Sequence, residues 1–270
     1  MKHLLFVAKD FFGFGGYQRQ AEGAWSWQHL TFVSSLMVLM IGLSVFLGIF
    51  NRHRSLKHKN IVLIVSAIMI DAFEILKIVV ALVKADNPGT KWQQLLPLFL
   101  CSIQLITIPL AAFAKGRIKQ SAMDFVFIFG ILGAVAGTFG AVQNYANYPV
   151  ISIDNVVSGI THSISGFASL YIVISGMASM KLKNLPISFG ILGGFCVAAI
   201  GANIAFDYNY MFLMRDDGTP YVIFYNLVGG NPVLYPMIVI FLFIVYMSLF
   251  WLVFNLIKTK GFKDLSHWKT

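Results

Sequence analysis

The sequence predicts an all-α integral membrane protein, a bundle of seven transmembrane helices with its N-terminus outside and its C-terminus in the cytoplasm. Of its 270 residues, 58% are hydrophobic and only 11% are charged, with a mean hydropathy of +0.77, whereas soluble domains carry roughly a quarter charged residues. Apolar runs of about 20 residues recur along the chain, and each can cross a bilayer as a helix. No soluble segment is left over, so residues 1–270 are expected to form a single membrane domain.

Short polar or charged breaks divide the apolar part of the chain into seven expected helices. The charged stretch NRHRSLKHKN separates the first two, KADNPGTK the second and third, and KGRIKQ the third and fourth. The polar turn QNYANYP, the basic MKLKN and the longer DYNYMFLMRDDGTPY follow in turn. The helices are expected at residues 27–50, 61–83, 94–114, 121–142, 155–179, 185–206 and 233–257.

The distribution of Lys and Arg sets the expected orientation. Basic residues gather in residues 51–60, 115–120 and 181–183 and in the tail 258–270, and short loops rich in Lys and Arg stay cytoplasmic. Residues 1–24 are expected to lie on the outer membrane surface as an aromatic-rich segment. The net charge of +9 then reflects this cytoplasmic excess of Lys and Arg, which attracts anionic lipid headgroups. The expected partners are membrane lipids of the cell membrane and not nucleic acid, because the basic residues occur only in short loops.

Two pairs of glycines predict close contact between helices. Gly133 and Gly137 form a GxxxG pair in the fourth expected helix, and Gly190 and Gly194 form another in the sixth. Such pairs let helix backbones approach closely in lipid. Packing within the chain is the expected use of both pairs.

The second expected helix carries three ionisable residues, Asp71, Glu74 and Lys77, at steps of three that place them on one face. Charge at membrane depth is costly and usually faces the interior of the bundle. Glu74 and Lys77 can pair and offset much of each other's desolvation. Two interpretations stay open, a structural ion pair that holds two helices together and a substrate or proton site.

A thiol and an imidazole are expected at the same depth as this pair. At about 1.5 Å per residue, Cys101, His162 and Lys77 each lie roughly 10 Å below the outer surface, with Glu74 and Gln104 one turn deeper. An imidazole beside a thiol can accept its proton and create a thiolate nucleophile. Too few Cys and His side chains reach this layer for a zinc site, and no cofactor or metal is expected. Cys196 is interpreted as apolar packing.

Three further residues stand at the expected outer mouth of this layer. His29 follows Trp25 and Trp27, which are interpreted as anchors at the membrane interface. Asn209 and Tyr210 lie in an outer connection. All three are candidates for substrate contact, and each also has a plain structural interpretation, as an anchor or as part of a turn.

Four short motifs occur in an order that resembles a known family. WQHL, LPLFLCSI, GITHSI and NYMFL together resemble the family of bacterial YwaF and animal transmembrane protein 164, over about residues 25 to 255. The resemblance implies a polytopic membrane protein with a Cys–His acyltransferase activity on phospholipids, in which Cys101 is the nucleophile and His162 its base. His29 matches the His that often opens the first helix of the family. The chain departs from the family pattern at Phe99, where a His is common, and at GGNPVLYP before the last helix.

The leading hypothesis is therefore an integral membrane acyltransferase or lipid esterase that acts on phospholipid or glycolipid acyl esters through Cys101 and His162. Gln104 is a candidate oxyanion donor, and Lys77, held by Glu74, could orient a phosphate or favour the thiolate. The alternative is a seven-helix transporter or small-molecule receptor in which Asp71, Glu74, Lys77 and His162 bind a proton or ligand. The two hypotheses differ at Cys101, which only the enzyme requires.

Overall fold

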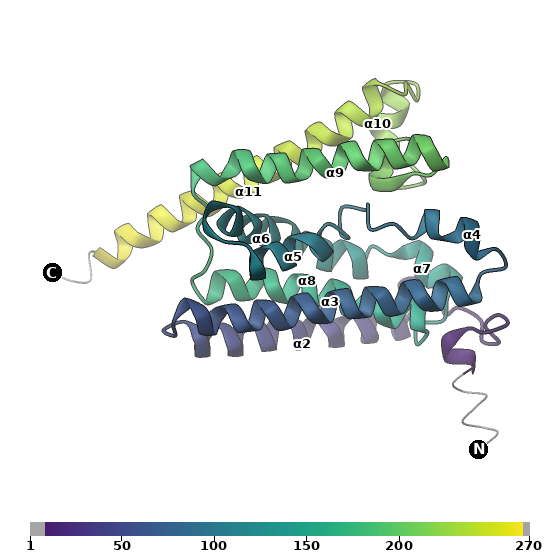
Figure 1. Cartoon of the computed structure of the whole chain (residues 1–270), viewed down its shortest axis with the longest axis horizontal. Helices are drawn as coiled ribbons and strands as arrows, with labels where there is room; N and C mark the ends of the chain where they lie inside the picture. Colours follow the sequence, from purple (N-terminus) through teal and green to yellow (C-terminus); the bar gives the residue numbers. More distant parts are fainter. Residues whose placement is uncertain (1–8, 267–270) are drawn as a thin grey trace, which may run out of the picture. The chain divides into compact units, whose positions relative to one another are not determined.

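The structure, a computed structural model, describes residues 9–266 and contains helices, turns and irregular segments but no strand over that range (Figure 1). Its contacts divide the chain into two compact units. The first comprises Met1–Pro97 and Cys101–Ala178, and the second comprises Leu98–Leu100 and Ser179–Thr270. A single domain over the whole chain stays a prediction, and each unit is described by itself.

Most helices belong to the first unit. Its α-helices are α2 (Trp27–Asn51), α3 (Leu56–Lys84), α4 (Pro88–Lys91), α5 (Gln104–Phe113), α6 (Gly116–Thr138), α7 (Val142–Asn147) and α8 (Ile153–Ile174), with a 3-10 turn η1 (Trp92–Gln94). The second unit has α9 (Leu185–Phe206), α10 (Val222–Leu227) and α11 (Leu234–Ser266), with 3-10 turns η2 (Leu182–Asn184) and η3 (Tyr210–Phe212).

Five helical segments in the described part of the chain are long and apolar enough to cross a membrane. These segments confirm a membrane protein with several apolar helices, at five of the seven expected positions. The count of seven spans, the orientation and the choice of the cell membrane stay predictions. The five segments are Trp27–Asn51, Gly116–Asn147, Ile153–Ile174, Leu182–Phe206 and Leu234–Lys258.

The second expected span coincides with α3, which differs from those five in its charge. It is a continuous helix of 29 residues, about 43 Å long at 1.5 Å per residue, so its length suffices to cross a bilayer. It carries Asp71, Glu74 and Lys77 in its apolar middle, as the sequence indicates.

The third expected span, residues 94–114, is not a continuous helix, and that prediction is wrong. Only Gln104–Phe113 is α-helical, ten residues in all, or about 15 Å. Residues 95–103 form bends and turns. Pro97 explains the break, because proline lacks a backbone N–H and disfavours the α conformation in the preceding residue. Non-helical backbone at membrane depth is tolerated only where protein surrounds it or where it lines a cavity.

Two lysines fix the register of α3 against α8, which runs alongside it in the opposite direction (Figure 1). At one end, Lys59 Nζ donates to the carbonyl oxygen of Ser175, 2.7 Å away, at the C-terminus of α8. At the other end, Lys84 Nζ lies 2.6 Å from Asp154 Oδ2 in the first turn of α8. Both partners also suit the helix dipole, which favours cations at the C-terminus and carboxylates at the N-terminus.

Helix α6 lies in the core of the first unit and packs against α5 and α8. Every residue from Ser121 to Gly130 is buried, including the polar Ser121 and the acidic Asp124. Its contact with α8 depends on small residues. A Cβ atom on Gly130 would lie 2.7 Å from the carbonyl oxygen of Ser165, so an alanine there would push the two backbones apart. Of the two predicted glycine pairs, only Gly137 makes such a close approach, against the ring of His162. A Cβ on Gly133 would make ordinary contacts, and one on Gly190 or Gly194 would meet nothing within 4 Å, so close backbone contact at these pairs is not found among the described residues.

The described part of the N-terminal segment is fastened to the first unit by polar contacts. Arg19 binds Asp10 at 2.6 Å and the carbonyl oxygen of Ile151 at 2.7 Å, and its bond to Asp10 lowers the pKa of that carboxyl group. Tyr17 donates a hydrogen bond to Asp154, and burial together with this bond raises the pKa of Tyr17. The expected placement of residues 1–24 on the membrane surface stays a prediction, and residues 1–8 lie outside the described range.

We expect α3 to cross the membrane in spite of its three ionisable residues. Single cysteines introduced at Lys57 and Gly89, both exposed, in a Cys101→Ser, Cys196→Ser background should react with an impermeant maleimide from opposite sides of the membrane. Position 57 should react only from the cytoplasm. Reaction of both positions from one side would mean that α3 does not cross, and reaction of position 57 from outside would reverse the orientation.

Candidate functional site

A small cavity in the first unit collects the reactive side chains. Its volume is about 50 Å³, enough for one or two water molecules at roughly 30 Å³ each. Three elements line it, namely α3, the turn that leads into α5, and α8. The lining residues are Ile70, Glu74, Lys77, Cys101, Ser102, Leu105, Ser158, Thr161 and His162.

The register of α3 and α8 explains why Lys77 and His162 meet in this cavity. Lys77 lies two helical turns before Lys84, and His162 lies about two turns after Asp154, the partner of Lys84 in the ion pair at that end. At 1.5 Å per residue, both side chains therefore start about 10–12 Å from that ion pair. Their predicted common depth agrees with this geometry.

Glu74 and Lys77 form the predicted ion pair. The distance from Lys77 Nζ to Glu74 Oε1 is 2.6 Å. The side chain of Lys77 is 30% exposed, and that of Glu74 is 11% exposed. Lys77 also acts electrostatically on both Cys101 and His162. A positive charge at this place attracts a thiolate and repels an imidazolium ion.

Cys101 occupies the turn that precedes α5. The amide of Gln104 donates to the carbonyl oxygen of Cys101 at 3.4 Å, and the amide of Leu105 donates to that of Ser102 at 3.0 Å. The thiol thus stands at the N-terminal end of a ten-residue helix, where the helix dipole favours negative charge. A continuous helix, as the sequence predicts, would not have placed a helix N-terminus here.

His162 projects from α8 onto α6 and is held by packing. A Cβ atom on Gly137 would lie 2.3 Å from Cε1 and 2.4 Å from Nε2 of the imidazole, so the ring occupies the space that glycine leaves open. Among the described residues, neither ring nitrogen has a hydrogen-bond partner. The imidazole lines the cavity without a hydrogen bond that would fix its tautomer.

Gln104 and Asp71, two other predicted site residues, are absent from the cavity lining. Gln104 is fully buried, its Oε1 accepts a hydrogen bond from Thr107 at 3.0 Å, and its Nε2 has no partner among the described residues. It therefore keeps an unused donor close to the thiol in sequence, but this donor does not line the cavity. Asp71 lies one turn before Glu74 and is half-buried.

The contacts of His29 are those of a residue that holds the fold together, and they do not support its predicted contact with substrate. It is fully buried, and its Nδ1 accepts a hydrogen bond from the amide of Trp25 at 2.9 Å. The proton must then sit on Nε2, which lies 3.3 Å from the carbonyl oxygen of Thr138. The ring also packs on Tyr145, with 3.9 Å between ring centroids. The Nε2 bond thus attaches α2 to the end of α6, and the Nδ1 bond fixes the chain just before α2.

Asn209 and Tyr210 belong to the second unit, where they shape a strained turn. Asn209 Oδ1 accepts from the amides of Met214 and Arg215, at 2.9 and 3.1 Å. Tyr210 is fully buried and its ring packs on that of Phe99, with 5.2 Å between centroids. Met211, with φ of 57°, adopts a left-handed conformation that is uncommon for its residue type. These contacts support the structural interpretation of both residues, and their predicted role in substrate binding has no support within the unit.

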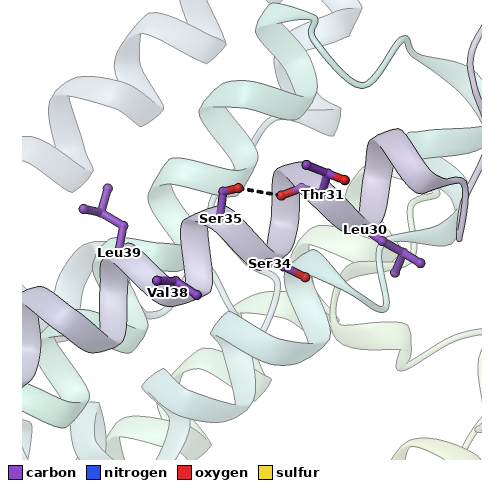
Figure 2. Close-up of a pocket in the computed structure, with 6 residues that line it drawn as sticks. All are labelled: Leu30, Thr31, Ser34, Ser35, Val38 and Leu39. Carbon is purple, nitrogen blue, oxygen red and sulfur yellow. Dashed lines mark hydrogen bonds between the residues drawn. The ribbon is translucent and has the colours of Figure 1, made fainter.

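A larger hollow on the outside of α2 lacks reactive groups. Figure 2 shows its lining, in which the hydroxyl of Ser35 donates to the carbonyl oxygen of Thr31 at 2.7 Å. One helix provides every lining residue, and none of these residues is ionisable. The lining residues are Leu30, Thr31, Ser34, Ser35, Val38 and Leu39.

Sequence reasoning missed the hydroxyl groups that α8 contributes. Ser158 and Thr161 line the cavity. Ser165, one turn further, is 2% exposed, and its hydroxyl has no partner among the described residues. Ser158, Thr161 and Ser165 follow one another at spacings of three and four residues, and this was the available signal, because such spacing places them on one helical face.

Comparison with known proteins identifies a family. The model of the TMEM164 family matches residues 24–253. No curated protein matches the chain, and no solved structure does.

We expect Lys77→Met to destabilise the protein, because Glu74 would be left unpaired in the cavity. Breaking a fully buried pair costs roughly 3–5 kcal/mol, and the partial exposure of Lys77 reduces the expected loss in free energy of unfolding to about 2 kcal/mol. The double variant Glu74→Gln, Lys77→Met should recover most of that loss. Thermal unfolding in detergent measures both, and equal destabilisation of the single and double variants would contradict this account.

Proposed function

Because the chain belongs to the TMEM164 family, we propose that this membrane protein is a thiol-dependent lipid acyltransferase or lipid esterase, with Cys101 as nucleophile and His162 as base. The observation that carries the proposal is that the thiol and the imidazole, which come from separate elements, line one cavity beside the Glu74–Lys77 pair. A protein that used this layer only for packing would not need a thiol, an imidazole and an ion pair in one small space.

The chemistry follows from these groups. His162 accepts the thiol proton, and the Cys101 thiolate attacks the carbonyl carbon of a lipid ester. The tetrahedral intermediate collapses when His162 returns the proton to the leaving alcohol oxygen, which leaves an acyl thioester on Cys101. The hydroxyl of a second lipid, or water, then attacks the thioester after losing its proton to His162, and the thiol is restored.

The elements around the cavity suit the charge that develops during this reaction. Lys77 and the N-terminal end of α5 both stabilise a thiolate. A tetrahedral oxyanion needs hydrogen-bond donors, and Ser102 and Ser158, which carry hydroxyl groups, line the same cavity. The hydroxyl of Thr161 already donates to the carbonyl oxygen of Ser158 at 3.0 Å. The cavity of about 50 Å³ is too small for an acyl chain, so binding of a lipid requires the lining helices to separate.

The expected substrate position also agrees with this layer. An ester carbonyl of a phospholipid or glycolipid lies just below the headgroups, and the thiol and imidazole are proposed to lie about 10 Å below the outer surface. The substrate would enter from the outer leaflet.

We expect Cys101 to react with a chloroacetamide that carries an acyl chain, while Cys196 stays inert. Cys196 is a matched control because it is 2% exposed within α9 and lines no cavity with a base. His162→Ala should lower the rate of labelling at Cys101 by on the order of 10²-fold, a typical contribution of a general base. Mass spectrometry locates the adducts.

The same protein should form a thioester with a phospholipid that carries an isotope-labelled acyl chain. The expected adduct has the mass of the labelled acyl group on Cys101, disappears with neutral hydroxylamine and is missing in Cys101→Ser. Equal labelling of Cys101 and Cys196, or labelling that is indifferent to His162, would contradict the proposal and favour a transporter or receptor.

A further inference from the structure

We infer that Gly137 is a positioning residue of the proposed active site: its missing side chain forms the seat that holds the His162 imidazole at the cavity. This inference rests on the proposed function, because it concerns the base of that reaction. The two residues come from different helices, Gly137 from α6 and His162 from α8, which pack together in the first unit.

The distances show how closely the ring fits. An alanine Cβ at position 137 would lie 2.3, 2.4 and 2.5 Å from three atoms of the imidazole, Cε1, Nε2 and Nδ1. Carbon atoms in contact keep about 3.5–4.0 Å between them. The ring would therefore have to move by more than 1 Å to admit a single methyl group.

Among the described residues, no hydrogen bond holds the ring in its place, so packing has to do so. Neither nitrogen of His162 has a hydrogen-bond partner among the described residues, whereas catalytic histidines are usually oriented by a third group. Packing against Gly137 is the contact in this structure that can replace that group. Loss of the seat should change the position of the base relative to Cys101, and misplacement by about 1 Å can cost on the order of 10²-fold in rate.

Other glycines of the same helix give matched controls. At Gly133, one turn earlier, a Cβ would meet its nearest atoms at 3.8 Å from Ser165 Oγ and 3.9 Å from Cys101 Cβ, which are ordinary contacts. At Gly130 a Cβ would clash with the backbone of α8, 2.7 Å from the carbonyl oxygen of Ser165. Three substitutions to alanine thus differ only in what the new methyl group meets.

Helix propensity cannot explain the expected loss. None of the three glycines has a positive φ, and replacing glycine by alanine within a helix stabilises it by about 1 kcal/mol. Any loss at Gly137 therefore comes from the contact with the ring.

The first test measures the labelling of Cys101 as a function of pH with the acyl chloroacetamide. Gly137→Ala should lower the rate by on the order of 10²-fold and give a pH profile like that of His162→Ala. Gly133→Ala should keep the rate and the profile of the wild type. Gly130→Ala should lower the temperature of thermal unfolding through a packing defect between α6 and α8. Its pH profile of Cys101 labelling therefore shows the effect of a packing defect that does not involve the imidazole. A wild-type profile in Gly137→Ala, or equal losses at Gly133 and Gly137, would overturn the inference.

The second test uses the double variant Gly137→Ala, His162→Ala, and it does not depend on catalysis. Removal of the ring creates room for the methyl group, so the double variant should be more stable than Gly137→Ala alone. This coupling between contacting residues is what a double-mutant cycle measures. If Gly137→Ala does not fold, recovery of folding in the double variant supports the seat, and failure of both overturns it.

The two proposals fail in different ways. If labelling is indifferent to His162→Ala, the proposed function fails while the stability coupling between positions 137 and 162 can still be observed. If His162→Ala loses labelling but Gly137→Ala does not, the base is retained and the seat is refuted.

Discussion

The register between α3 and α8 is the constraint on which the candidate site depends. Lys59 binds the C-terminal end of α8 at 2.7 Å, and Lys84 binds Asp154 near its N-terminal end at 2.6 Å. With both ends fixed, a shift by one turn would break both contacts and leave charged groups unpaired, which is costly when the groups are partly buried. This register puts Lys77 and His162 at the same level of the first unit.

The broken helix before α5 is the second requirement. A continuous helix through residues 94–114 would satisfy its own backbone and could place Cys101 against lipid or neighbouring helices. The break at Pro97 instead leaves residues 95–103 irregular, and such backbone must be surrounded by protein or line a cavity. The thiol thereby comes to the cavity on a turn, at the N-terminal end of a short helix. Membrane proteins use interrupted helices in the same way to bring helix ends to binding sites.

Apolar periodicity and residue depth could predict much of this arrangement from the sequence. The long helices appear at the expected positions because runs of about 20 apolar residues have few alternatives in a bilayer. Depth along a helix is nearly proportional to residue number, which predicts a common layer for His162, Glu74 and Lys77. Cys101 lines the same cavity, but it lies on a turn, where that rule does not apply.

What the sequence could not provide is the direction in which side chains point. His29 has the residue type and the position of a site residue, yet both of its nitrogens bind backbone groups. Asn209 and Tyr210 likewise serve a turn whose left-handed residues no local pattern predicts. The apolar character of residues 94–114 predicts a continuous helix, but Pro97 cannot donate a backbone hydrogen bond and the helix is interrupted there. To predict the contact between Gly137 and His162, one has to know which face of α6 points toward α8. Tertiary contacts determine that face, and the sequence of α6 alone does not show it.

In the proposed reaction, the ion pair has a second role, which concerns how easily a proton moves between Cys101 and His162. Transfer of a proton from Cys101 to His162 creates a negative and a positive charge in a poorly solvated place, which is costly unless nearby charges compensate. Lys77 stabilises the thiolate and destabilises the imidazolium ion, and Glu74 does the reverse. Either charge alone would favour one position of the proton. Lys77 alone would favour the thiolate and disfavour the imidazolium ion, and Glu74 alone would favour the thiol and the imidazolium ion. The two side chains are 2.6 Å apart, so each partly offsets the effect of the other on a charge that forms in the cavity. A site that must take up and return one proton in every half-reaction is better served by such a pair than by a single buried charge.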